Sequence, residues 1–262
     1  MSKKILLCGY GAIGSRMYPD YKALGDVTVY DPKFKNTKDL PGDNFYGDFD
    51  EIKKLGKFDF AILALPTPTV NGQCDTSIVK NVIYDLKDMV DVIIVRSTVY
   101  VGFMDEIKKE VPNVVFSPEF YGTTQHQVIN DFLILAGDRE LTRKVAQLWW
   151  GAKKGDFKIK FYDDMKTAEL IKYMENCFLA LKVVFCNSFY FACKKAGVEY
   201  DDVREGWLMD SRVNPSHTIV YDDHHFYDSH CFNKDVPAFA NQFDDPLMKR
   251  VVEINDERRK TS

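Results

Sequence analysis

The segment KILLCGYGAIGS, Lys4–Ser15, joins a short apolar run to three closely spaced glycines. The pattern Gly9-x-Gly11-x-x-Gly14 permits a tight turn, a close approach of backbone to pyrophosphate, and close packing of a helix on a strand. The helix expected to begin here offers free N–H groups to an anion. We therefore predict a phosphate-binding loop built from Gly9, Gly11, Ala12, Ile13 and Gly14.

Asp31 predicts which dinucleotide is bound. It ends the second strand-like run, VTVYD, 17 residues after Gly14. A carboxylate at this position accepts hydrogen bonds from both ribose hydroxyls and repels a 2′-phosphate, so we expect NAD rather than NADP. The alternative is a cluster of turn glycines beside a surface aspartate. The order strand, loop, helix, strand and acid favours the dinucleotide site.

The first part of the chain alternates β-rich runs with helical stretches such as Thr76–Met89 and Arg139–Trp150. The runs are continuously apolar, which is typical of parallel strands covered on both faces. This alternation predicts an α/β fold, with a Rossmann-type doubly wound parallel sheet over residues 1–162. The candidate strands are Lys4–Cys8, Asp26–Asp31, Phe58–Leu65, Asp91–Ser97, Asn113–Ser117, Phe132–Ala136 and Lys158–Tyr162.

The second part of the chain is predicted to be a mostly helical domain, residues 163–262. Asp163 and Asp164 are good N-caps for a long helical pattern that runs to about Ala196 and stops at Gly197. A helix of this length suits a domain-spanning or dimer-forming role. We also expect a helix from about Asp201, a loop over Asp210–Asp235 and a last helix over Asp245–Lys260.

Composition and charge limit the class of protein. Of the 262 residues, 45% are hydrophobic and 28% are charged, which is typical of a soluble globular protein. The formal net charge of −4, with acids and bases mixed along the chain, argues against nucleic acid as a partner. Apolar runs such as Phe60–Leu65 are too short to cross a membrane, and the N-terminus does not resemble a signal peptide. We expect a cytoplasmic protein.

The six cysteines, at positions 8, 74, 177, 186, 193 and 231, include no CxxC spacing. Reduced thiols are therefore expected, and a zinc site is not. Three of the cysteines fall inside the predicted long helix, where Cys177, Cys186 and Cys193 are expected in the helix core or a dimer seam. His224, His225 and His230 lie among aspartates, but their spacing does not indicate a metal site.

Several further motifs occur in a recognisable order. They are LPTPT (Leu65–Thr69), IVRSTVYVGF (Ile94–Phe103), FSPEF (Phe116–Phe120), TAELIKYMENCFLALK (Thr167–Lys182), DSRV (Asp210–Val213), HCFNKD (His230–Asp235) and VVEINDERR (Val251–Arg259). In this order the chain resembles the UDP-glucose/GDP-mannose dehydrogenase family over nearly its whole length. The resemblance implies that a sugar-nucleotide alcohol is oxidised to a carboxylate by two NAD-dependent hydride transfers at one site.

The resemblance assigns Cys231 as a nucleophile that traps the intermediate aldehyde as a thiohemiacetal, which is then oxidised to a thioester. This is sound chemistry, because a thiol adds readily to an aldehyde and a thioester transfers its acyl group to water. Lys172 and Asn176, four residues apart on the long helix, share a face and would stabilise the oxyanion. By the same match, Asp235 orients a water or a base.

The remaining site residues also follow from the resemblance. Thr98 and Glu119 match residues that hold the hydrolytic water and contact cofactor or substrate. Arg212 matches an arginine that reaches the substrate of a neighbouring subunit, so a homodimer is expected. The residues expected along the NAD are Leu65, Pro66, Thr67, Pro68, Thr69, Ser97, Thr98 and Val99, and those expected on the substrate are Glu119, Lys172, Asn176, Arg212 and Cys231.

Three features depart from the family pattern. The family continues into another nucleotide-binding domain, whereas this sequence stops at Ser262, so a shortened member is expected. The glycine-rich loop before the family's cysteine is replaced by FYDSH, residues 226–230, and the family's second acid is replaced by Thr123. The first two changes affect the sugar-nucleotide pocket, and the third affects water activation.

Plainer interpretations of the same residues stay open. Cys231 is alternatively a small buried hydrophobe, Lys172 a surface lysine, and Glu119 and Asp235 local caps. Two other functions also stay open. One is a two-electron NAD-dependent dehydrogenase of a smaller hydroxy substrate, and the other is a non-catalytic NAD-binding subunit.

Overall fold

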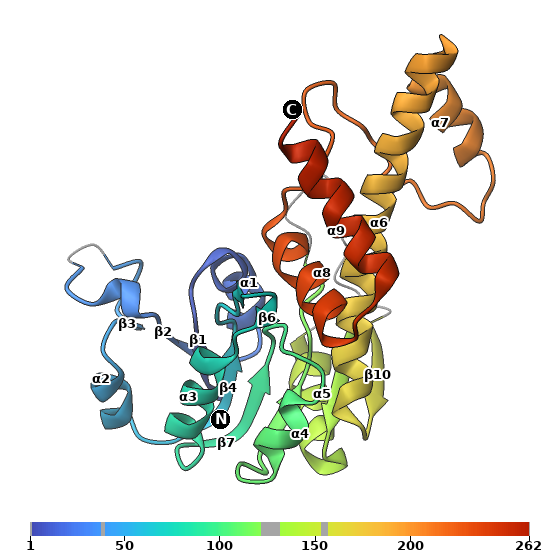
Figure 1. The fold of residues 1–262 in the computed structure, drawn as a ribbon. Coiled ribbons are helices and arrows are strands. Elements are labelled where there is room, and N and C mark those ends of the chain that lie inside the picture. The colour runs from blue at the N-terminus through green and yellow to red at the C-terminus, as the bar shows by residue number, and fades with distance from the viewer. Residues whose placement is uncertain (1, 38–39, 122–131, 153–156, 262) are drawn as a thin grey trace. The chain divides into compact units, whose positions relative to one another are not determined.

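A computed structural model describes residues 2–37, 40–121, 132–152 and 157–261 (Figure 1). The chain divides into two compact units. The first comprises the described residues of Met1–Pro68, Asp75–Tyr121 and Val128–Lys172, and the second those of Thr69–Cys74 and Tyr173–Ser262. The division falls inside the long helix, and the sequence-based boundary at residue 162 stays a prediction.

The first unit is built on an eight-stranded sheet with the order β10-β9-β8-β7-β4-β1-β2-β3. Strand β1 lies in the middle, where Leu6 is paired in parallel with both Thr28 and Ala61. This central sheet confirms the predicted Rossmann-type fold. The strands are β1 Lys4–Cys8, β2 Asp26–Tyr30, β3 Phe45–Tyr46, β4 Phe58–Leu63, β7 Val90–Val95, β8 Val114–Phe116, β9 Phe132–Gly137 and β10 Lys158–Tyr162.

One pairing differs from the expected parallel arrangement. Strand β9 is antiparallel to β8, with Phe116 opposite Ala136, and β10 is parallel to β9. The last two strands therefore run against the other six. In a sheet covered on both faces, parallel and antiparallel strands are equally apolar, so apolar content alone does not distinguish the two directions.

Alternate residues of the central strand enter two separate cores. Leu6 and Cys8 belong to the core on one face of the sheet, and Ile5 and Leu7 to the core on the other, as the two-residue period of a strand requires. Helices α3 and α4 contribute to the first core, and α1 and α5 to the second. The helices of this unit are α1 Ala12–Lys22, η1 Pro32–Phe34, α2 Phe49–Lys54, α3 Ser77–Leu86, α4 Phe103–Lys108 and α5 Arg139–Ala152.

The long helix α6, Met165–Ala196, has the predicted start and end. Asp164 accepts hydrogen bonds from the backbone N–H of Lys166 and the hydroxyl of Thr167, both at 3.1 Å. Gly197 follows the helix with φ 74, the left-handed conformation that commonly ends a helix. By length and composition α6 is apolar enough to cross a membrane, but half of its most apolar window is buried, and core helices meet the same criterion.

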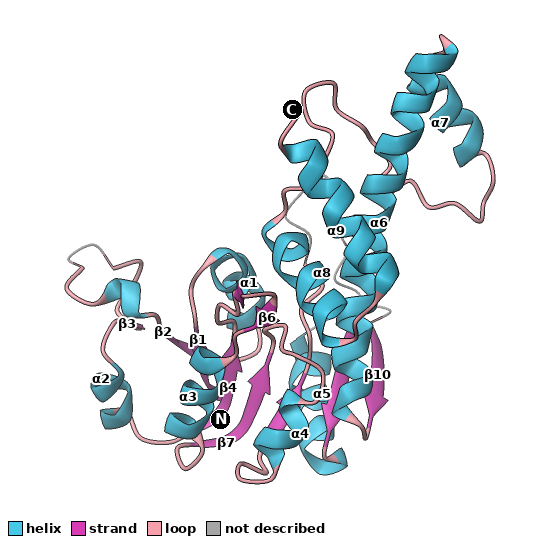
Figure 2. Cartoon of the chain, viewed as in Figure 1, coloured by secondary structure: helices cyan, strands magenta, loops and turns pink. Residues whose placement is uncertain are grey.

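Helices predominate in the second unit (Figure 2). Its main core joins α6, α8 and α9 through residues such as Cys177, Val236 and Val251. A small hairpin of β5 and β6 also packs on α8, where the side chain of Asn241 donates to the carbonyl of Gly72 at 3.1 Å. The elements beyond α6 are α7 Tyr200–Leu208, α8 His230–Gln242, α9 Pro246–Arg259, β5 Thr69–Val70 and β6 Gln73–Cys74.

The loop predicted over Asp210–Asp235 was wrong at its C-terminal end. Residues from His230 onward form the first turns of α8, and the Ser229 hydroxyl caps them by accepting the N–H of Phe232 at 3.0 Å. Pro237 lies inside this helix. Because proline usually breaks a helix, the sequence there does not read as helical. Cys231 and Asp235 are therefore helical residues.

The N-terminal part of α6 carries a buried carboxylate. Glu169 accepts the N–H of Gly102 at 2.6 Å and the N–H of Met104 at 3.0 Å, so it joins α6 to the start of α4. Burial raises the pKa of this carboxyl to about 7, and Asp105 and Asp164 add to the increase, while the two N–H donors oppose it.

This raised pKa predicts a pH-dependent stability. The folded chain binds the Glu169 proton more tightly than the unfolded chain, so the contribution of this group to stability is greatest below about pH 4.5 and is lost as the pH rises through about 7. Relative to Glu169→Gln, the wild-type chain should lose up to about 3 kcal/mol of unfolding free energy over this range. Urea denaturation of both proteins at a series of pH values measures the difference. A difference that does not vary with pH contradicts the prediction.

Candidate functional site

The glycine loop follows β1 and leads into α1. Gly9 has φ 96, and a Cβ there would lie 2.3 Å from the carbonyl oxygen of Ala64. A Cβ on Gly14 would lie 2.0 Å from the carbonyl oxygen of Gly9, so the helix packs on the loop too closely for any side chain. At Gly11, by contrast, no heavy atom lies within 4 Å of the added carbon. The loop thus leaves open space at the N-terminus of α1, where an anion is favoured.

Asp31 follows β2 and turns its carboxylate toward this loop. One oxygen accepts the N–H of Tyr10 at 2.7 Å, and the other accepts the N–H of Lys33 at 3.0 Å. The Lys33 ammonium donates to the Tyr10 carbonyl. These bonds fix the carboxylate beside the glycine loop. Because each carboxylate oxygen has two lone pairs, both can still accept a ribose hydroxyl.

The loops after β4 and β7 are joined by one hydroxyl. Ser97 Oγ accepts the N–H of Leu65 and donates to the carbonyl of the same residue, both at 2.8 Å. Thr67, Thr98 and Val99 are buried beside this contact, whereas Pro66 and Pro68 are exposed. The segments predicted along the NAD in the first unit therefore share the carboxyl end of the parallel strands, which is where open α/β sheets bind ligands.

At the end of β8, Glu119 forms a buried ion pair with Arg96. Its other oxygen accepts the N–H groups of Phe120 at 2.9 Å and Tyr121 at 3.1 Å. Arg96 also donates to Ser117 at 2.8 Å. These partners hold the loop after β8 to the strand before Ser97. The predicted contact of Glu119 with water, cofactor or substrate stays a prediction, and Thr123 lies outside the described residues.

Lys172 is buried at the last α6 position of the first unit. Its ammonium lies 4.9 Å from the centroid of the Phe120 ring, a distance at which the ring attracts a cation. The ammonium is thus directed toward the loop after β8. The plainer interpretation as a surface lysine does not fit this burial.

The second unit brings Asn176 and Asp235 together. The Asn176 amide donates to Asp235 Oδ2 at 2.6 Å, and both side chains are buried. The ammonium of Lys234 lies 2.5 Å from Asp235 Oδ1. The hydroxyl of Thr69, in the β5–β6 hairpin, donates to the carbonyl of Lys234 at 2.6 Å. Asp235 therefore accepts one hydrogen bond from a side chain of α6 and one from a side chain of its own helix, α8.

Cys231 lies in the first turn of α8, four residues before Asp235, so the two side chains share a face of the helix. It packs partly buried against the core of the second unit. Cys177 in the same core is buried, and burial raises the pKa of its thiol to about 12. A thiol with so high a pKa is inert, because only the thiolate is nucleophilic. Of the six cysteines, only Cys74 and Cys231 are not buried.

The FYDSH segment is held by α9. Asn255 accepts the N–H of Tyr227 at 2.7 Å and donates to its carbonyl at 3.2 Å. Arg259 donates to the same carbonyl at 3.0 Å and pairs with Asp228 at 3.1 Å. The ring of Tyr227 is buried in the core. The motif VVEINDERR contains both α9 residues, but its sequence did not indicate that they anchor this loop.

Arg212 is exposed and pairs with Asp210 two residues earlier. Behind this turn, the partly buried ammonium of Lys182 donates to the carbonyl of Asn214 at 2.8 Å. The role of Arg212 toward a neighbouring subunit stays a prediction. Glu169, Arg96, Lys182, Lys234, Asn255 and Arg259 are supporting residues that the sequence analysis missed.

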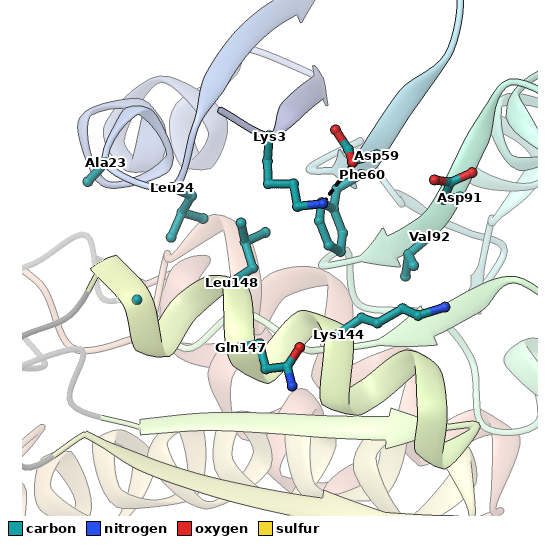
Figure 3. Close-up of a pocket in the computed structure, with 11 residues that line it drawn as sticks. Lys3, Ala23, Leu24, Asp59, Phe60, Asp91, Val92, Lys144, Gln147 and Leu148 are labelled. Carbon is teal, nitrogen blue, oxygen red and sulfur yellow. Dashed lines mark hydrogen bonds and ion pairs between the residues drawn. The ribbon is translucent and has the colours of Figure 1, made fainter. Parts of the chain in front are cut away.

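Metal clusters and cavities also mark potential ligand sites. Within the described ranges, no three His, Cys, Asp or Glu side chains are grouped closely enough to hold a metal ion. A cavity of about 780 Å³ lies at the amino ends of β1, β4 and β7, where Lys3 pairs with Asp59 at 3.0 Å and faces α5 (Figure 3). None of the predicted site residues lines this cavity.

Two domains of one known family match this chain. The UDP-glucose/GDP-mannose dehydrogenase family matches through its NAD binding domain over residues 24–144 and through its central domain over residues 166–257. The chain belongs to this family. The match to the NAD binding domain identifies NAD as the cofactor, and the open space at Gly11 and the carboxylate of Asp31 fit that molecule.

Family members with assigned activities are longer than this chain. The UDP-glucose 6-dehydrogenase of Campylobacter jejuni is 32% identical over 216 residues, covering 77% of this chain and 54% of that protein. The UDP-glucose 6-dehydrogenase of Rhizobium meliloti is 27% identical over 241 residues, covering 83% and 54%. The chain thus spans about half the length of the curated relatives it matches.

Solved structures share the fold at lower identity. A UDP-glucose dehydrogenase from Pyrobaculum islandicum superposes with a TM-score of 0.78 at 21% identity, covering 98% of this chain and 68% of that one. A 3-hydroxyisobutyrate dehydrogenase from Mycobacterium tuberculosis superposes with a TM-score of 0.71 at 17% identity, covering 98% and 94%. At these identities the likeness establishes the fold alone.

Two glycine substitutions test the cofactor loop of this family member. Gly14→Ala should destabilise the fold by about 2 kcal/mol or more, because its Cβ would overlap the Gly9 carbonyl. Gly11→Ala should cost no more than about 1 kcal/mol but weaken NAD binding at least about tenfold, because its methyl group enters the space for the pyrophosphate. Thermal unfolding and calorimetric NAD titration measure the two effects. Unchanged NAD affinity in Gly11→Ala contradicts the assignment of this loop.

Proposed function

We propose that this protein is an NAD-dependent sugar-nucleotide 6-dehydrogenase that oxidises a primary alcohol, as in UDP-glucose, to a carboxylate. The main support is the shared face of Cys231 and Asp235 on α8, with Asp235 bound to the buried amide of Asn176. A nucleophile, a carboxylate and an amide donor are the groups that a thioester route needs. The match to the family's two domains supports an NAD site and a sugar-nucleotide substrate.

In the first oxidation the carbinol carbon gives up a hydride and its hydroxyl gives up a proton, which yields an aldehyde. Bound NAD would supply the hydride acceptor, and the proton would pass to solvent. Lys172 and Asn176 lie four residues apart on α6, so one oxygen of the substrate can receive both an ammonium and an amide donor. These donors stabilise the alkoxide that develops as the hydride leaves.

In the second oxidation Cys231 adds through sulfur to the aldehyde carbon, and the carbonyl oxygen takes up a proton. With a second NAD bound as hydride acceptor, this thiohemiacetal would lose a hydride, and its hydroxyl proton would pass to solvent, which would leave a thioester on Cys231. Water then adds to the acyl carbon and the thiolate leaves. In this proposal Asp235 orients the water, with Thr98 and Glu119 assisting, and the carboxylate is released.

A second function has one observation in its favour. The 3-hydroxyisobutyrate dehydrogenase structure, whose name refers to a smaller hydroxy substrate, is covered over 94% of its length by the same fold. The alternative is a two-electron oxidation of a smaller hydroxy substrate that uses Lys172 and Asn176 without covalent chemistry.

The number of NADH molecules formed per substrate separates the two functions. For the wild-type protein with UDP-glucose or a related sugar nucleotide, we expect two NADH and a carboxylate. Cys231→Ala should form at most one NADH per substrate, and acid formation should fall by roughly three orders of magnitude, because the aldehyde is no longer trapped. Absorbance of NADH and mass analysis of the product measure both quantities.

Cys193→Ala is the matched control, since Cys193 is a buried core thiol in the same unit and should retain two NADH per substrate. Full acid production by Cys231→Ala contradicts the thioester route. One NADH per substrate in the wild type favours the two-electron function. NAD binding without NADH formation from any sugar nucleotide indicates a non-catalytic subunit.

We further propose that the protein is a cytoplasmic homodimer assembled through α6. Met174, Phe178, Phe185 and Phe189 are exposed large apolar residues at spacings of four and seven, so they form one stripe on the helix. On α7, Trp207 extends the stripe, with its ring centroid 5.9 Å from that of Phe185. An apolar surface of this kind is typical of a protein interface.

Replacing two residues of the stripe tests this dimer. Phe178→Glu with Phe185→Glu should halve the mass measured by sedimentation velocity, because two charges per subunit would be buried without partners. Lys195→Glu, an exposed charge change on the same helix, should leave the mass unchanged. A wild-type monomer at concentrations well above those used for assay contradicts the proposed dimer.

A further inference from the structure

Glu169 has a place in the fold that the proposed mechanism does not use. Its side chain is only 1% exposed, and it lies on α6 three residues, or one helical turn, before Lys172. Both of its oxygens accept backbone N–H groups, from Gly102 and Met104. A buried carboxylate that bonds another segment at both oxygens fixes the position of that segment.

The segment that Glu169 holds is the loop from Ser97 to Gly102, between β7 and α4. At its first residue the loop is tied to Leu65 through the Ser97 hydroxyl. At its last residue it is tied to α6 through Glu169. Thr98 and Val99 lie between these two anchors. Without the bond from Gly102 to Glu169, the Ser97 hydroxyl would be the remaining one of these two anchors.

We propose that Glu169 is a positioning residue for the dehydrogenase, whose carboxylate holds the loop bearing Thr98 to the turn of α6 that bears Lys172. The proposal rests on the proposed function, because it takes Thr98 and Lys172 as site residues of that reaction. The ionised form performs this role, since only a carboxylate offers two full acceptors. The protonated acid carries an O–H on one oxygen, so one of the two N–H bonds is weakened.

The charges around Glu169 set the pH range of this effect. Asp105 on α4 and Asp164 at the start of α6 disfavour its ionisation. The ammonium of Lys166 favours ionisation, although it is paired with Asp105 at 3.0 Å. Together with burial these groups bring the pKa to about 7, so the loop contact changes as the pH passes through neutrality.

The test compares the full-length wild type with Glu169→Gln, and with Glu110→Gln as the matched control. Glu110 is an exposed acid beyond the other end of α4, so its variant should behave as the wild type. For kcat and for NAD affinity, the ratio of wild type to Glu169→Gln should be about tenfold or more near pH 8.5 and approach one near pH 5.5. If Glu169 had only a structural role, Glu169→Gln would lower kcat and NAD affinity by the same factor at every pH.

A second measurement uses the wild-type protein alone and does not depend on catalytic activity. In the wild-type protein, the amide resonances of Gly102 and Met104 should titrate together with a midpoint near 7. Amide shifts that do not titrate, or a ratio that stays constant with pH, overturn the proposal. A chain that shows the pH-dependent NAD affinity but oxidises no sugar nucleotide defeats the proposed function and leaves the role of Glu169 in the NAD site intact.

Discussion

Helix α6 carries polar side chains past three apolar cores, and the structure depends on how each polar group is satisfied. A buried polar group without a partner costs about 1–3 kcal/mol, and a buried charge costs more. Glu169 is satisfied by two backbone N–H groups, Asn176 by Asp235, and Lys182 by the carbonyl of Asn214. Because each partner belongs to a different segment, one helix fixes the loop before α4, the first turns of α8 and the turn after Arg212.

The sequence predicted the elements whose signals are local. The central strands, the glycine loop and the start and end of α6 all follow from short patterns, such as an apolar run, three glycines or an aspartate cap. The helical state of Cys231 was missed because Pro237, inside α8, is a residue that usually breaks helices. The helix forms because Ser229 caps it and it packs on α6. The reversed direction of β9 was also missed, because burial on both faces gives the same composition in either direction.

The glycine loop and Asp31 were predicted from their pattern and spacing, and most of the other site residues were assigned by a resemblance, but the side chains that support them were not predicted. Glu119 was recognised through its Pro-Glu-Phe motif, but its ion pair with Arg96 joins residues 23 positions apart. The FYDSH segment was expected to affect the substrate pocket, which stays a prediction, but the burial of the Tyr227 ring and the bond of its backbone to Asn255 were not foreseen. Such contacts depend on the packing of distant segments, which no local pattern encodes. The motifs therefore identify the candidate site residues but not the distant residues that hold them in position.

The β5–β6 hairpin has a consequence for how this chain is organised. The hairpin directly follows the Leu65–Pro68 segment of the first unit, but it belongs to the second unit, where hydrogen bonds of Thr69 and Asn241 join it to α8. Among the described residues, the backbone leaves the first unit at Pro68, returns after Cys74 and leaves again at Lys172. No single cut of the chain therefore separates the residues of the two units, and any fragment that contains the whole first unit also contains the hairpin.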